Sequence, residues 1–427
     1  MRRIAVIDAP SNLGLRPPSP GTVPGCAKAP GALRDHGLVV RLGASDAGCV
    51  VPPRYDPEGW RPGDGVCQAE EIADYTMRLA ARIGKITERG DFPLVLGGDC
   101  SIVLGAGLAM RRRRAAEGGR YGLIFIDGHS DFRHSGNAEY IGAAAGEDLA
   151  LVTGRGQGEL TNIDDLRPYL REEDVVVLGI REHDEYRMDL RAAGIVFRTV
   201  PQIRAEGPGR SAAWAIEELG RVDGFWVHVD VDVLDPAAMP AVDAPDPGGI
   251  AFVELEQMIA DLVTRPACLG MEVTVFDPDY DPDGRYAEDV VDTLVGGLRP
   301  IWELSQPELS SGADPEPELA TDSRPEPEPE PEPDARPGPG ARGSDTAAEQ
   351  DGGSESQRRP RRPQSPALPS AADLGLGSIT VGDGGTRGGA SVARFGRGSK
   401  AAGSPGTDDK PGTGDNQSDS ERAEPGR

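Results

Sequence analysis

Cysteines and aromatic side chains are scarce in this sequence of 427 residues, basic residues are outnumbered by acidic ones, and long apolar runs are absent. The five cysteines include no C-x-x-C pair, which argues against a disulfide framework or a zinc knuckle and favours reduced thiols inside the cell. Basic residues number 45 against 71 acidic ones, and the net charge of -26 excludes a nucleic-acid groove. No apolar stretch is long enough to span a bilayer or to form a signal-peptide core. We therefore expect a cytoplasmic protein whose partners include neither nucleic acid nor a membrane.

The composition changes abruptly near Gln306. Proline and glutamate alternate from Pro325 to Pro333, and the sequence beyond is rich in Gly, Ser and Pro with few aromatic residues. Such a segment cannot bury enough apolar surface to offset the chain entropy that folding removes. The sequence therefore predicts a folded domain over residues 1–306 and a disordered tail over residues 307–427.

Before the tail, short apolar runs alternate with amphipathic segments. The composition of buried strands is found in RRIAVI, FPLVLGG, YGLIFID, DVVVLGI, FWVHVDV and CLGMEVTVF. The spacing of helices is found in AEEIADYTMRLAARIGKI, SIVLGAGLAMRRRRAAE and RSAAWAIEELGRV. This alternation predicts a parallel sheet with helices on both faces. Because such sheets bind ligands at the carboxyl ends of their strands, the residues directly after each run are candidates for the functional site.

Acidic residues follow two of these strands directly, as DGHSD at residues 127–131 and DVDVLDP at residues 230–236. Carboxylates crowded at one sheet edge repel one another unless a multivalent cation compensates their charge. Five or more O and N ligands exceed the need of one tetrahedral ion, so the pattern predicts two divalent ions that activate a water. Aspartate is also common in turns and caps, but two such motifs after two apolar strands favour the metal centre.

The order of four motifs, GGDCS, DGHSD, DVDVLDP and GMEV, resembles the ureohydrolase family of arginases and agmatinases. The resemblance extends to GCAKAPGALRDHGL at residues 25–38 and covers roughly residues 1–305. It implies a three-layer α/β/α fold with a central, mainly parallel sheet, a binuclear manganese centre and homotrimers or hexamers. It also implies that a metal-bridged hydroxide attacks the carbon of a guanidino or amidine group in a small substrate, which releases urea and an amine.

The family's metal-ligand pattern carries over to all but one position, because Cys100 stands where the family has a histidine. A thiolate suits zinc, iron, cobalt or nickel better than manganese, so a ligating Cys100 predicts a changed metal preference. The alternative is that Cys100 is a small buried residue and one metal position is weak. The implied metal ligands are Cys100, Asp127, His129, Asp131, Asp230 and Asp232.

Roles beyond metal binding are assigned to four acids or histidines through the resemblance or through their surroundings. Asp131 matches the residue that passes a proton to the leaving amine, and Glu272 matches the carboxylate that pairs with the substrate's guanidinium. Asp184, in GIREHDEY, matches the acid that contacts the substrate's amino group. His228, inside the apolar FWVHV, is interpreted as a core histidine with satisfied hydrogen bonds.

The loop after DGHSD matches the family's substrate-binding loop S-G-N-x-H only in part. Ser135 and Asn137 match the residues that bind the substrate, but Glu139 stands in the place of the histidine. His134 is therefore an alternative proton shuttle. This departure leaves arginine itself in question as the substrate.

Two other functions are compatible with the pattern. A catalytically impaired binding or regulatory protein on the same fold would explain the lost histidine and the long acidic tail. A binuclear phosphoesterase would also use D-x-H-x-D, but it needs more histidines than the five present and a G-N-H-[DE] loop, which the sequence lacks.

Overall fold

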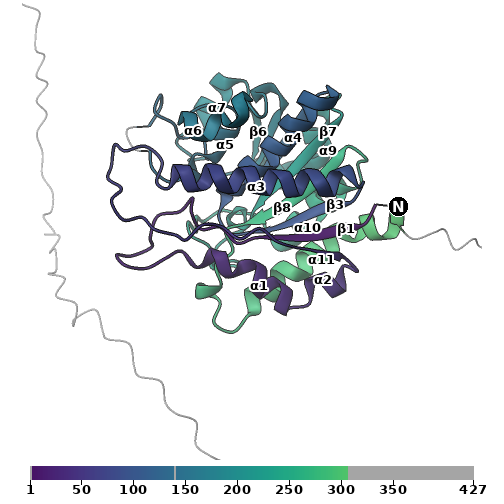
Figure 1. The fold of residues 1–427 in the computed structure, drawn as a ribbon. Coiled ribbons are helices and arrows are strands. Elements are labelled where there is room, and N and C mark those ends of the chain that lie inside the picture. The colour runs from purple at the N-terminus through teal and green to yellow at the C-terminus, as the bar shows by residue number, and fades with distance from the viewer. Residues whose placement is uncertain (1, 139–140, 306–427) are drawn as a thin grey trace, which may run out of the picture. The chain divides into compact units, whose positions relative to one another are not determined.

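The computed structural model describes residues 2–138 and 141–305 (Figure 1). Their centre is an eight-stranded sheet in the order β2-β1-β3-β8-β7-β4-β5-β6, in which every pair of neighbours is parallel. The predicted parallel sheet with helices on both faces is confirmed. The strands are β1 (Ile4–Ala9), β2 (Ser45–Cys49), β3 (Phe92–Gly97), β4 (Tyr121–Ile126), β5 (Val175–Ile180), β6 (Val196–Thr199), β7 (Gly224–Asp230) and β8 (Cys268–Thr274).

Helices cover both faces of the sheet, and α3 crosses the near face in Figure 1. The α-helices are α1 (Ala29–Asp35), α2 (Leu38–Arg41), α3 (Ala69–Glu88), α4 (Val103–Glu117), α5 (Asp148–Val152), α6 (Gly158–Thr161), α7 (Arg187–Ala193), α8 (Val200–Glu206), α9 (Pro208–Leu219), α10 (Phe252–Val263) and α11 (Arg285–Ser305). The 3-10 turns are η1 (Gly25–Lys28), η2 (Cys100–Ile102), η3 (Ala144–Gly146), η4 (Ile163–Asp165), η5 (Glu172–Asp174), η6 (Val231–Val233) and η7 (Pro278–Tyr280).

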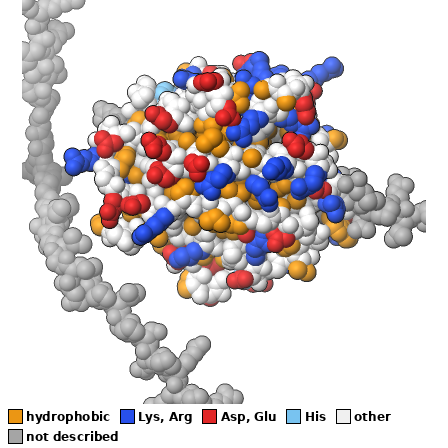
Figure 2. Space-filling view, viewed as in Figure 1, with side chains coloured by type: hydrophobic (Ala, Val, Ile, Leu, Met, Phe, Trp, Pro, Cys, Tyr) orange, Lys and Arg blue, Asp and Glu red, His pale blue; other side chains and the backbone are white. Residues whose placement is uncertain are grey.

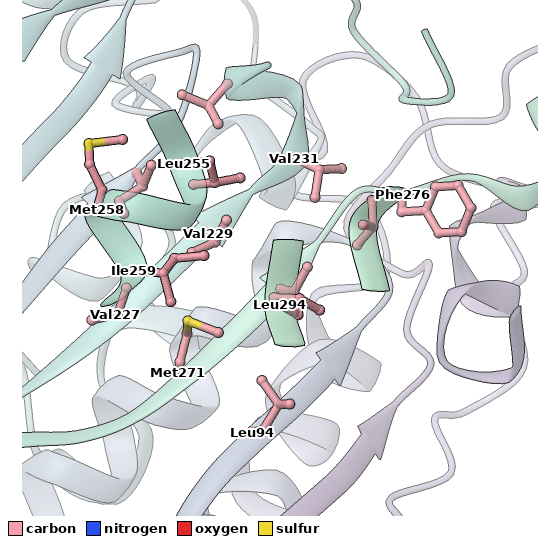
Figure 3. Packing of buried hydrophobic residues seen from close by; sticks show 14 of the residues in the cluster. Leu94, Val227, Val229, Val231, Leu255, Met258, Ile259, Met271, Phe276 and Leu294 are labelled. Carbon is pink, nitrogen blue, oxygen red and sulfur yellow. The ribbon is translucent and has the colours of Figure 1, made fainter. Parts of the chain in front are cut away.

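The central strands are buried along their whole length, which explains why their sequences are continuously apolar. On β7, Val227 and Val229 pack toward α10 and α11, as Figure 3 shows. Because side chains alternate along a strand, Trp226 points to the opposite face, toward α3 and α4. His228 and Asp230 share the face of Trp226, so this face of β7 carries polar groups toward the functional edge.

The short edge strands β2 and β6 were not among the strands that the sequence predicts. The residues of β2, SDAGC, are mostly exposed, so this strand has no apolar run to reveal it.

Acidic and basic side chains are interspersed on the molecular face drawn in Figure 2. In the described ranges, no helix combines the length and the apolar character needed to cross a membrane. The predicted tail, residues 307–427, lies outside the described residues.

Candidate metal centre

The predicted metal ligands converge at the carboxyl edge of the sheet because the three strands that precede them, β3, β4 and β7, end there. Cys100 begins η2 after β3, Asp127 follows β4, and Asp230 ends β7. Asp99 fixes the turn at Cys100, since its carboxylate accepts hydrogen bonds from the Ser101 amide at 2.9 Å and from the Ser11 hydroxyl at 2.6 Å. The glycines, the acid and the serine of GGDCS therefore position the thiol.

Two sets of potential ligands share one carboxylate. In the first set, ligand atoms of Cys100, Asp127 and Asp131 all lie within 4.8 Å of one another. In the second set, the same holds for Asp127, His129 and Asp232. Asp127 is fully buried, and its Oδ2 has no hydrogen-bond partner within the described part of the chain. A divalent cation would satisfy this oxygen, and the donor set of carboxylates, imidazole and thiol fits divalent metals.

Asp230 lies between the two sets. Its Oδ2 is 2.7 Å from the Cys100 Sγ, and its Oδ1 accepts a hydrogen bond of 2.7 Å from the Asp232 amide. The Cys100 Sγ also lies 3.0 Å from the Thr274 Oγ1. The thiol is therefore in contact with an implied ligand, and it is itself buried.

The electrostatics of the centre are those of a site that needs positive charge. Burial, reinforced by neighbouring carboxylates, raises the pKa of Asp127 and of Asp230 well above the ordinary value of an aspartate. Burial likewise raises the pKa of Asp131 to about 7. The charge of Asp232, whose carboxylate lies 3.0 Å from Nδ1, raises the pKa of His129 to about 10. Without a metal, protons compensate this cluster, and a divalent cation would replace them.

A cavity of about 580 Å³ opens onto the centre. Its lining includes five of the six implied metal ligands, namely Cys100, His129, Asp131, Asp230 and Asp232. Asp184 also lines it, with its carboxylate oriented by hydrogen bonds from the amides of Ser130 at 3.0 Å and Tyr186 at 2.8 Å. The structure therefore brings Asp184 together with the ligands, where the resemblance implied a substrate contact.

Glu272 is placed differently from what the resemblance implies. It is fully buried and is not among the described residues that line the cavity. Its Oε1 lies 2.9 Å from Nδ1 of His228, its neighbour on the adjacent strand. Glu272 lies two residues before Thr274, whose Oγ1 contacts the Cys100 Sγ. Its side chain is therefore on the same face of β8 but farther from the carboxyl edge of the sheet.

The loop candidates also lie outside the cavity lining in the described ranges. The side chain of Asn137 is bound to the backbone of its own loop. Its Oδ1 accepts a hydrogen bond from the His134 backbone amide at 2.8 Å, and its Nδ2 donates one to the Phe132 carbonyl at 3.0 Å. His134 accepts a hydrogen bond from the Gly136 amide at 3.0 Å, and Ser135 is exposed. The substrate and shuttle roles assigned to His134, Ser135 and Asn137 therefore have no support from their positions. Glu139 lies outside the described residues.

Two residues near the centre were missed or misread from the sequence. Asp148, at the start of α5, is fully buried, and neither of its carboxylate oxygens has a partner in the described chain. His228 is a buried histidine as predicted, but only its Nδ1 is satisfied and its Nε2 has no partner among the described residues. The available signal for Asp148 was an acid directly before the apolar helix LALV.

Comparison with known proteins agrees with the fold and the motifs. The arginase family model matches residues 3–296. The arginase of Bacillus caldovelox is 29% identical over 307 residues, which cover 70% of this chain and 98% of that arginase. The arginase of Brevibacillus brevis is 31% identical over 299 residues, 68% of this chain and 95% of its own.

The solved structure of the Bacillus caldovelox arginase superposes with a TM-score of 0.61 at 29% identity, covering 70% of this chain and 98% of that one. The family match includes all the segments that carry the two ligand sets. Because the match also extends through all eight strands of the sheet, this chain belongs to the arginase family.

Proposed function

We propose that this protein is a metal-dependent hydrolase of a guanidino or amidine C–N bond in a small molecule. The observation that carries the proposal is the pair of ligand sets that share Asp127, most of whose other members line one cavity. Membership of the arginase family supports the reaction class.

The metals that we propose are two divalent ions, with manganese the first choice and zinc, iron, cobalt or nickel as the alternatives that would follow if Cys100 bound one of the two. Asp127, His129, Asp131, Asp230 and Asp232 would hold them. When bound, such ions supply a water activated at neutral pH and a Lewis acid that polarises the substrate.

Asp131 is the residue that we assign to proton transfer. It lines the cavity, so its carboxylate can exchange a proton with a substrate bound there. Asp184 would orient the substrate through its carboxylate.

The charges of the cavity favour a cationic substrate that also carries a carboxylate. Acids such as Asp184, Glu185 and Asp243 line it and favour a guanidinium or amidinium group. Arg16 and Arg133 line the same cavity and offer partners for a carboxylate. The panel that tests this includes arginine, agmatine, guanidinobutyrate, guanidinopropionate and formiminoglutamate.

The experiment is turnover of this panel by full-length protein loaded with manganese, cobalt, nickel or zinc, with urea, formamide and free amine as readouts. We expect hydrolysis of at least one member, and its loss in Asp232→Ala, which removes a ligand of the second set. Absence of turnover with every metal and substrate would contradict the proposal, and tight binding without product would indicate a binding or regulatory protein instead.

We also propose, from the family resemblance, that the protein is cytoplasmic and assembles into a trimer or hexamer. Sedimentation equilibrium of the purified protein tests the assembly, and a monomer at micromolar concentration would contradict it.

A further inference from the structure

A third cluster of ligand-type side chains lies beside the two sets described above. One ligand atom each of Cys100, Asp148 and His228 lies within 4.8 Å of the other two. The three residues come from η2, α5 and β7, and all are buried. Neither Asp148 nor His228 belongs to the six implied metal ligands.

The cluster contains buried polar atoms that nothing in the described chain satisfies. They are both carboxylate oxygens of Asp148 and the Nε2 of His228. Each side chain is 0% exposed. A carboxylate and an imidazole nitrogen are unfavourable in such a place without a partner. A cation between them would satisfy Nε2 and a carboxylate oxygen of Asp148.

The imidazole of His228 is held in the arrangement typical of a metal ligand. Its Nδ1 lies 2.9 Å from the Glu272 carboxylate, and its ring stacks on Phe125 with 4.4 Å between centroids. A carboxylate at one ring nitrogen fixes the tautomer and leaves the lone pair of the other nitrogen available for a metal. This contact accounts for the buried position of Glu272.

We propose that Cys100, Asp148 and His228 form a further metal site that binds one divalent transition ion through Sγ, a carboxylate oxygen and Nε2. Glu272 is a positioning residue that acts through His228. A donor set of sulfur, nitrogen and oxygen favours zinc, cobalt or iron over manganese. The ion enters from the cavity, which Cys100 lines. The site goes beyond the proposed function and assigns Cys100 to this ion rather than to the two-ion centre.

The test is titration of metal-free, full-length protein with cobalt(II), followed by the near-ultraviolet charge-transfer band that a thiolate ligand produces. We expect the band in the wild type and its loss in Cys100→Ser. In Asp148→Asn and His228→Gln, the cobalt affinity measured from the band should fall at least tenfold. Asp131→Asn, which alters only the first set, and His36→Gln, a histidine outside the cluster, should change it less than twofold.

Asp148→Asn keeps the shape of the side chain. If His228→Gln does not fold, the cobalt affinity of Asp148→Asn tests the site. The inference is overturned if the wild type shows no band, or if Asp131→Asn abolishes it while Asp148→Asn and His228→Gln retain it. X-ray absorption of the zinc-loaded protein should show one sulfur and at least one imidazole nitrogen around the same ion, and a shell of oxygens alone would also overturn the inference.

The proposed function can fail separately from this site. His129→Asn removes a ligand of the second set only, so we expect hydrolysis to fall while the cobalt band persists. Hydrolysis in a protein that shows no band overturns the metal site and keeps the proposed function. A band in a protein that hydrolyses nothing supports the metal site and contradicts the proposed function.

Discussion

At the scale of single residues, the main question concerns Glu272, which the family resemblance assigns to the substrate and the structure pairs with His228. A carboxylate that is 0% exposed and outside the cavity lining in the described chain has no access to a substrate in this arrangement. Its effect must therefore pass through the imidazole of His228.

Substitution of Glu272→Gln separates the two roles. Because an amide oxygen still accepts a hydrogen bond from Nδ1, we expect a loss of about 1 kcal/mol in unfolding free energy. KM for the substrate should change less than twofold, whereas cobalt affinity at the Cys100 band should fall. The measurements are denaturant unfolding, steady-state kinetics and cobalt titration. A large rise in KM with unchanged cobalt affinity would support the substrate role instead.

At the scale of elements, the turn from β3 into η2 determines where the thiol lies. Gly98 packs against the segment after β1 so closely that an added Cβ would lie 1.7 Å from the Ser11 carbonyl oxygen. The Ser11 hydroxyl in turn donates a hydrogen bond to the Asp99 carboxylate. This bond ties the segment after β1 to the turn that positions Cys100. No side chain fits at Gly98 without a backbone shift.

Gly98→Ala should therefore destabilise the fold by about 1–3 kcal/mol, the usual cost of overpacking, and weaken metal binding by displacing Cys100. The matched control is Gly31→Ala in α1, where an added Cβ has nothing within 4 Å. That change should be neutral or stabilise by up to about 1 kcal/mol, because alanine favours a helix. Thermal unfolding and metal content measure both effects, and equal stability of the two variants would contradict the role of the turn.

At the scale of the whole molecule, the buried charges of the centre link stability to pH and metal. The folded pKa of Asp131 is about 7 against an ordinary 3.8, and that of His129 is about 10 against 6.5. In both cases the folded state binds more protons than the unfolded state between these values, so stability falls as pH rises.

The melting temperature of the metal-free protein should thus fall as pH rises from about 4 to 10, with the contribution of Asp131 lost first, below pH 7, and that of His129 above it. With saturating metal, the cation replaces the protons and the melting temperature should rise over the lower part of this range. Calorimetry of both forms across pH checks this. A metal-free protein that gains stability between pH 5 and 7 would contradict the role of the buried carboxylates.

The described core is closed by α11, which ends at Ser305. Truncation after Gln306 should therefore leave a cooperative thermal transition within about 2 °C of that of the full chain, measured by circular dichroism. Loss of the transition would show that the tail contributes to folding.

The sequence by itself determined six of the eight strands, the edge of the sheet that carries the candidate site, and most of the side chains that cluster there. These follow from local pattern: apolar runs such as YGLIFI form buried strands, and an acid directly after a parallel strand can only lie at the carboxyl edge. DGHSD and DVDVLDP therefore predicted their own positions.

Only the tertiary structure decided the pairing of Glu272 with His228 and the hydrogen bond of the Asn137 side chain to its own loop. It alone also decided that Cys100, Asp148 and His228 meet. These depend on the register between strands and on a loop and a helix that pack over the sheet. The alternation of side chains along a strand sets the face on which a residue lies, but it does not set the register of that strand against its neighbour. No local sequence pattern therefore predicts that residues from η2, α5 and β7 meet.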